Sequence, residues 1–63
     1  MKKSELEKLL KLNGCRFVKS GKRHERWYSP SSDVYFSVPR HEGKEIPNGT
    51  LSSILKQAGI YSN

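Results

Sequence analysis

The chain has 63 residues and a formal net charge of +6, because 12 residues are Lys or Arg and only six are Asp or Glu. A chain of this length forms one domain, expected over residues 1–63, and buries only about 60% of the surface that it exposes when unfolded. Such a domain has no room for a deep, enclosed active site. The positive charge predicts attraction to a polyanion or to an acidic protein partner.

Cysteine content and hydropathy narrow the class of protein further. Cys15 is the single cysteine, so it can form neither an internal disulfide nor a zinc site with a second cysteine. No segment approaches the ~20 apolar residues of a membrane span, and the first residues lack the apolar core of a signal peptide. We therefore expect a cytoplasmic protein that binds no membrane, holds no metal and needs no cofactor.

Residues 4–13 are predicted to form the first helix. Ser4 and Glu7 have the spacing of a capping box, in which both side chains pair with backbone amides at the helix start. Gly14 supplies the left-handed residue after the helix, and Cys15 is expected to contact Leu10 there and to be structural. The apolar stripe consists of Leu6, Leu9 and Leu10. The solvated face is expected to carry Lys3, Lys8 and Lys11.

Two short strands are predicted over residues 16–20 and 24–29, joined by a turn at Gly21-Lys22. The second strand is informative because successive side chains of a strand point to opposite faces. Trp27 is the best candidate to pack into the core, on the same face as Glu25 and Ser29. The open face would then carry His24, Arg26 and Tyr28.

A third strand is predicted over residues 34–38, where apolar and polar residues alternate. Its core face would carry Val34, Phe36 and Val38. Residues 40–49 are expected to form a loop of a length that is often functional. A second helix is predicted over residues 50–58, with Thr50 as its N-cap and Gly59 at its end. The apolar stripe of this helix consists of Leu51, Ile54, Leu55 and Ala58.

The order helix, strand, strand, strand, helix predicts an α+β domain. Three antiparallel strands with one apolar face need a cover, and the two amphipathic helices supply it. We therefore expect a three-stranded antiparallel sheet with both helices on one face. The other face of the sheet and the loops are left for binding or chemistry.

Residues 20–30 hold more positive charge than a small domain needs in order to fold. His24 lies in this segment and could be a core, a surface or a catalytic histidine. A histidine with an ordinary pKa of about 6.5 can pass a proton either way near neutral pH. The cations around His24, which could hold a phosphate and favour the catalytic reading, are Lys22, Arg23 and Arg26.

RNA carries its own nucleophile, the 2′-hydroxyl group. A base that removes the proton of this hydroxyl allows in-line attack on the adjacent phosphorus without a metal ion, and cations stabilise the charge on the phosphate oxygens. His24 in its cationic surroundings therefore predicts a metal-independent endoribonuclease. Two alternatives stay open, a non-catalytic RNA-binding module and a basic subunit that serves only an acidic protein partner.

Four further positions are candidates for RNA contact. Tyr28 and Tyr35 could stack on unpaired bases, and they could equally be cross-strand partners that order the sheet. His41 follows Arg40 and could be a second proton carrier, a phosphate ligand or a structural residue. We expect binding or structure for His41 rather than catalysis, and we expect Arg40 to contact RNA.

The motifs taken together resemble the HicA family, the toxins of HicA–HicB type II toxin–antitoxin systems. The similarity extends over residues 4–60. It is carried by Gly14-x-x-Phe17, by Gly21-Lys22-Arg23-His24 with Trp27-Tyr28-Ser29-Pro30, by Val38-Pro39-Arg40-His41, by Glu45-Ile46-x-x-Gly49-Thr50-Leu51, and by Ile54-Leu55-Lys56-Gln57-Ala58-Gly59-Ile60.

The resemblance implies a double-stranded-RNA-binding-like α-β-β-β-α fold and a toxin that cleaves mRNA and blocks translation and growth. It implies that His24, at the start of the second strand, is the catalytic histidine. It also implies a HicB-like antitoxin protein that binds the toxin and masks its active face. The family often has Gly-Ser before this histidine, whereas Lys22-Arg23 stands here.

Overall fold

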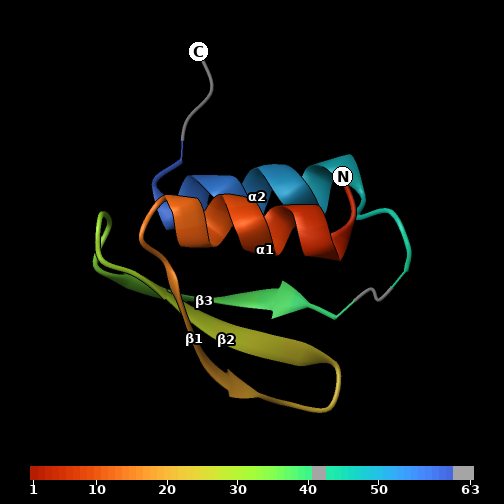
Figure 1. Ribbon diagram of the computed structural model, residues 1–63, viewed down its shortest axis with the longest axis horizontal. Coiled ribbons are helices and arrows are strands. Elements are labelled where there is room, and N and C mark those ends of the chain that lie inside the picture. The colour runs from red at the N-terminus through yellow and green to blue at the C-terminus, as the bar shows by residue number, and fades with distance from the viewer. Residues whose placement is uncertain (41–42, 61–63) are drawn as a thin grey trace.

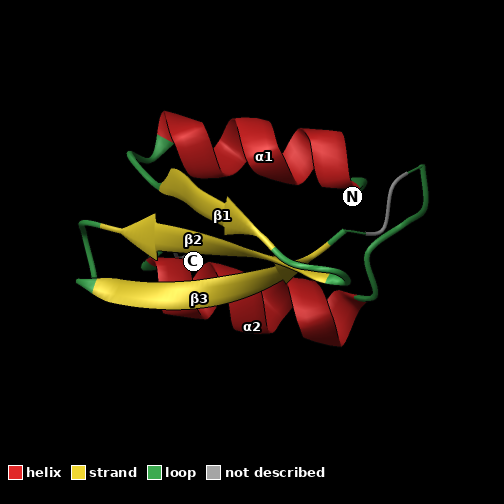
Figure 2. Ribbon diagram, turned by 90° about the horizontal axis from the view of Figure 1, so that it is seen from below, coloured by secondary structure: helices red, strands yellow, loops and turns green. Residues whose placement is uncertain are grey.

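Two helices and three strands follow the predicted order in the computed structural model, which describes residues 1–40 and 43–60. They are α1 (Lys3–Leu12), β1 (Arg16–Ser20), β2 (His24–Ser29), β3 (Val34–Pro39) and α2 (Asn48–Ala58). The strands form an antiparallel sheet in the order β1-β2-β3. Both helices lie on one side of this sheet (Figure 1), and Figure 2 views the molecule from the uncovered side. The predicted α+β architecture, consistent with a double-stranded-RNA-binding-like fold, is confirmed.

The core lies between the sheet and the helices, and Trp27 is its largest residue. Trp27 is fully buried in the middle strand β2, as its strand parity predicts. On β3, Phe36 and Val38 are buried, but Val34 at the strand's start remains 36% exposed, so its assignment to the core is wrong. The buried apolar residues are Leu6, Leu10, Cys15, Trp27, Phe36, Val38, Ile46, Ile54 and Ala58.

Each helix is followed by a glycine in the left-handed conformation, as predicted, although α1 ends at Leu12, one residue before its predicted end. After α1, Gly14 has φ +85°, and the amide of Cys15 donates a 2.9 Å hydrogen bond to the carbonyl of Leu10. After α2, Gly59 has φ +78°, and the amide of Ile60 donates a 2.9 Å bond to the carbonyl of Leu55. These bonds satisfy carbonyls that the helix itself leaves unpaired.

The predicted start of α1 is wrong by one residue. The helix begins at Lys3, and the side chain of Glu5, not Glu7, accepts the hydrogen bond from the backbone amide preceding the helix, that of Lys2, at 2.9 Å. Ser4 therefore lies inside the first turn and is exposed. The segment before the helix is held by a β-bridge between Lys2 and Glu45, so a contact distant in sequence sets where α1 begins.

The predicted start of α2 is also wrong, because Pro47 rather than Thr50 is the N-cap residue. The carbonyl of Pro47 accepts a 2.9 Å hydrogen bond from the amide of Leu51, so the first helical turn begins at Asn48 and includes Thr50. A proline costs little at this place, since its missing amide would have no partner within the helix.

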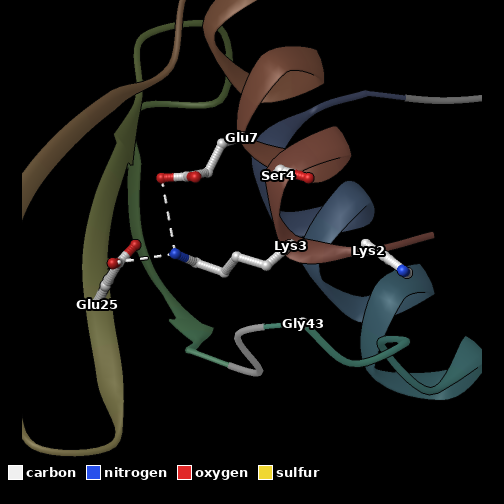
Figure 3. A pocket seen from close by; sticks show the side chains of 6 residues that line it. All are labelled: Lys2, Lys3, Ser4, Glu7, Glu25 and Gly43. Atoms are coloured by element: carbon white, nitrogen blue, oxygen red, sulfur yellow. Dashed lines mark hydrogen bonds and ion pairs between the residues drawn. The ribbon is translucent and has the colours of Figure 1, made fainter.

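The largest departure from the predicted solvated face is Lys3, which is buried. Its ammonium group lies 3.0 Å from the Glu25 carboxylate on β2 and 3.6 Å from Glu7 (Figure 3). Glu25 also accepts a 3.1 Å hydrogen bond from the indole Nε1 of Trp27. The pair borders an open pocket of about 350 Å³ beside the start of α1. Lys8 and Lys11, by contrast, are exposed as predicted.

Two opposing effects act on the Glu25 carboxyl. Burial by itself raises its pKa, but the hydrogen bonds from Trp27 and Lys3 and the positive charges of Lys3 and Arg40 outweigh burial. The pKa of Glu25 is therefore lower than its ordinary value. In its ionised form Glu25 links β2 to α1 through Lys3, and Glu25 is the residue next to His24.

In the part of the chain that the structure describes, neither helix has the length and apolar character needed to cross a membrane.

Candidate nucleic-acid interface

The uncovered face of the sheet is built of rows that run across the strands. Because paired residues of antiparallel strands share a face, the register places residues in three rows. The aromatic row contains Arg16, Tyr28 and Tyr35, the cationic row contains Lys19, Arg26 and Ser37, and the histidine row contains His24 and Pro39. Neighbouring rows lie about 6.7 Å apart along the strands. Cations and exposed rings therefore share one surface with His24.

His24 is exposed at the first position of β2, directly after the turn that joins β1 to β2. Its carbonyl accepts a 2.7 Å hydrogen bond from the amide of Gly21. A Cβ atom at Gly21 would lie only 2.9 Å from this carbonyl oxygen. The close approach therefore requires glycine, and it holds the backbone of His24 in a tight turn.

Arg40 ties this turn to the end of β3. Its Nη1 donates a 3.0 Å hydrogen bond to the carbonyl of Gly21 and a 3.5 Å bond to that of Lys22. Its backbone amide donates a 3.2 Å bond to the carbonyl of Arg23. Three successive residues before His24 are thus held by Arg40, so its guanidinium group has a structural contact that sequence reasoning missed.

The predicted phosphate ligands lie around His24. Lys22 and Arg23 are exposed in the turn, and Arg26 is exposed on the sheet face two residues beyond His24. Within residues 1–40 and 43–60, no carboxylate forms an ion pair with these three cations. Their charge therefore remains available to a phosphate. His41, the other predicted contact, lies outside the described residues.

Tyr28 and Tyr35 meet at the far end of the same face. Their ring centroids are 4.8 Å apart, with the ring planes inclined at 48°. The Tyr28 hydroxyl donates a 2.7 Å hydrogen bond to Asp33, which raises the pKa of Tyr28 above its ordinary value. The guanidinium carbon of Arg16 lies 5.6 Å from the Tyr28 ring centroid.

Two cations of this face, Arg16 and Lys19, are not among the predicted site residues. Regular alternation would place Lys19 on the same side as Phe17, which pairs with the core residue Trp27. The register shifts between Phe17 and Lys19, so Lys19 pairs instead with Arg26. Such a bulge adds one residue to a strand and turns the side chains after it to the other face. No residue type in this segment indicates the bulge.

Metal ligands do not gather in the described part of the chain, where no group of three or more His, Cys, Asp or Glu side chains is placed to hold an ion. We expect that the chemistry of this protein needs no metal ion, and the effect of a chelator on its activity tests this expectation.

Comparison with known proteins agrees with the resemblance seen in the motifs. Residues 4–60 match the family model described as HicA toxin of bacterial toxin–antitoxin. A protein of Photorhabdus laumondii subsp. laumondii named "Probable mRNA interferase HicA 2" is 40% identical over 60 residues, which cover 95% of this chain and 98% of that protein. No solved structure matches the chain significantly. The family match covers nearly the whole chain, and the chain therefore belongs to the HicA toxin family of bacterial toxin–antitoxin systems.

Proposed function

We propose that this chain, as a single domain over residues 1–63, is a metal-independent endoribonuclease that cleaves mRNA in the cytoplasm and so blocks translation and growth. The observation that carries the proposal is the exposed His24 at the end of an uncovered, cationic sheet face. The name of the Photorhabdus relative, an mRNA interferase, supports the same reaction. Lys22, Arg23 and Arg26 are the phosphate ligands.

His24 acts as the general base. Its imidazole takes the proton of a ribose 2′-hydroxyl, the 2′-oxygen forms a bond to the adjacent phosphorus, and the bond from phosphorus to the 5′-oxygen breaks. The leaving 5′-oxygen takes a proton from the imidazolium or from water. Cations stabilise the charge that develops on the phosphate oxygens. The products are a 2′,3′-cyclic phosphate and a free 5′-hydroxyl group.

The test is cleavage of a single-stranded mRNA fragment by the purified protein in excess EDTA. We expect cleavage to continue, and the 5′ fragment to end in a 2′,3′-cyclic phosphate. Cleavage that stops in EDTA and returns with added Mg²⁺ would contradict the mechanism. Binding of the fragment without any cleavage would instead identify a non-catalytic RNA-binding module of the same fold.

A HicB-like antitoxin is the proposed protein partner, and its expected position is over the face that bears His24. The support is membership of a toxin–antitoxin family and a cationic face with no helix over it (Figure 2). Co-expression with the antitoxin is expected to give a stable complex that no longer cuts RNA. Separate elution of the two proteins, or a complex that cuts as fast as the free toxin, would count against this arrangement.

Arg40 is proposed as a positioning residue for His24 in addition to its expected contact with RNA. Arg40→Ala should lower kcat about tenfold or more, since small displacements of a catalytic group cost this much. Arg40→Lys keeps the charge but loses the planar group that reaches two carbonyls, so we expect it to lose activity almost equally. Single-turnover kinetics on a short RNA measures both variants.

Arg26→Ala is the matched control, because it also removes one guanidinium charge near His24 but leaves the bonds from Arg40 to the turn in place. We expect it to raise KM more than it lowers kcat. Full activity of Arg40→Lys would show that Arg40 contributes charge alone.

A further inference from the structure

The exposed aromatic row suggests a use beyond holding the sheet together. Tyr35 is 58% exposed, whereas Tyr28, its neighbour on β2, is half-buried and fixed through its hydroxyl to Asp33 at 2.7 Å. Asp33 itself adopts the left-handed conformation, with φ +55°. Tyr35 is therefore an exposed ring that lies against Tyr28, and Tyr28 is held in place by Asp33 in the β2–β3 turn.

The charges around the two rings match an RNA strand. Arg16 stands over Tyr28 at 5.6 Å, and Lys19 and Arg26 fill the next row toward His24. Proteins that bind single strands combine cations along the backbone with aromatic rings on which bases stack. The same combination lies here between the tyrosine pair and His24, on the side of the sheet that no helix covers (Figure 2).

We propose that Tyr35, supported by Tyr28, is a stacking subsite for one unpaired RNA base, and that this subsite sets where the chain is cut relative to that base. The proposal rests on the proposed ribonuclease function. Tyr28 lies four positions after His24 along β2, a distance of about 13 Å. At this distance the stacked base belongs to a neighbouring nucleotide, not to the one whose hydroxyl is activated at His24.

The subsite selects for single-stranded substrates, since bases within a duplex are already stacked on each other and cannot reach the ring. It is tolerant of sequence, because every base has a π-face. A purine offers the larger face and is therefore the preferred base. Arg16 and Lys19 hold the phosphates between the subsite and the cleaved bond.

An abasic scan of a short single-stranded RNA with one cleavage site tests the proposal. Removing the base at one position near the cleaved bond should slow the wild-type protein about tenfold, within the range measured for stacking of a single base. Tyr35→Ala should cut the intact RNA more slowly by a similar factor and should no longer respond to the missing base. Tyr35→Trp, which keeps a ring, should retain the response.

Ser37→Ala, on the same strand and the same face, is the control and should keep the wild-type response to the missing base. Equal sensitivity of Tyr35→Ala and the wild type to the missing base would overturn the proposal, as would a scan in which no position matters.

Binding of the same RNAs to the His24→Ala variant, measured by fluorescence anisotropy, separates this proposal from the proposed function. If no variant cuts RNA, the ribonuclease function fails, but a tenfold loss of affinity for one abasic RNA still supports the subsite. If the protein cuts RNA and neither rate nor affinity responds to the scan, the subsite alone is refuted.

Discussion

His24→Ala should slow cleavage of single-stranded mRNA by about 10²- to 10⁴-fold, the usual contribution of a positioned general base. The loss should appear in kcat with RNA affinity nearly unchanged, because the cations that hold the phosphates remain. His24 is exposed at the start of β2, so the substitution should leave the melting temperature close to that of the wild type. Cleavage is measured in EDTA and folding by circular dichroism.

His41→Ala is the matched control, since His41 is the other histidine of the chain. We expect a smaller loss than for His24→Ala, in keeping with a role in binding or structure. Equal cleavage rates of His24→Ala and the wild type would refute the mechanism. A loss in His41→Ala as large as that in His24→Ala would show that two histidines share the proton transfers.

Growth provides a second measure of the same variant. Expression of the wild-type chain should arrest growth, and His24→Ala should restore it at equal protein level if toxicity depends on cleavage. Continued arrest by a folded His24→Ala protein would show that RNA binding alone is toxic.

Glu25→Ala should destabilise the domain by about 3 kcal/mol, the lower limit for removing one partner of a buried ion pair. The lower limit applies because the pair borders a pocket that opens to solvent. The variant leaves the buried Lys3 ammonium with Glu7 alone, at 3.6 Å, and it removes the acceptor of the Trp27 indole. In a domain of this size the melting temperature should fall by about 15 °C.

The contribution of Glu25 should also depend on pH. Its pKa in the folded chain lies below the ordinary value of 4.5, so the folded state favours the carboxylate more than the unfolded state does. The resulting stability is fully present above the unfolded pKa and is lost as pH falls through the folded pKa. The wild type should therefore lose stability below about pH 4.5, and the loss should be smaller in Glu25→Ala.

Glu7→Ala is the control for this pair, since it removes the other carboxylate near Lys3 from a more exposed position. Its cost should stay below about 1 kcal/mol. Equal melting temperatures of the two alanine variants would show that the Lys3–Glu25 pair contributes no more than a surface contact. Thermal unfolding between pH 3 and pH 7 measures both variants.

Local patterns were sufficient for the positions of the strands along the chain and for the glycines that follow both helices. The alternation in residues 24–29 placed Trp27 in the core and His24, Arg26 and Tyr28 together on the other face, because the strand period depends on the backbone alone. Gly14 and Gly59 marked the helix ends because few other residues adopt positive φ there. The predicted helix starts were wrong. Lys2 is held before α1 by its bridge to Glu45, and Pro47 begins α2 through its backbone carbonyl.

The sequence by itself determined the α+β order, the family and the face on which His24 lies, all of which depend on residue types and their spacing. Tertiary structure alone decided that Lys3 is buried against Glu25, that Arg40 holds the turn before His24, and that a bulge brings Lys19 beside Arg26. Each of these joins segments far apart in the chain or depends on strand register. Such contacts are set by how the elements pack, and no short stretch of residues encodes them.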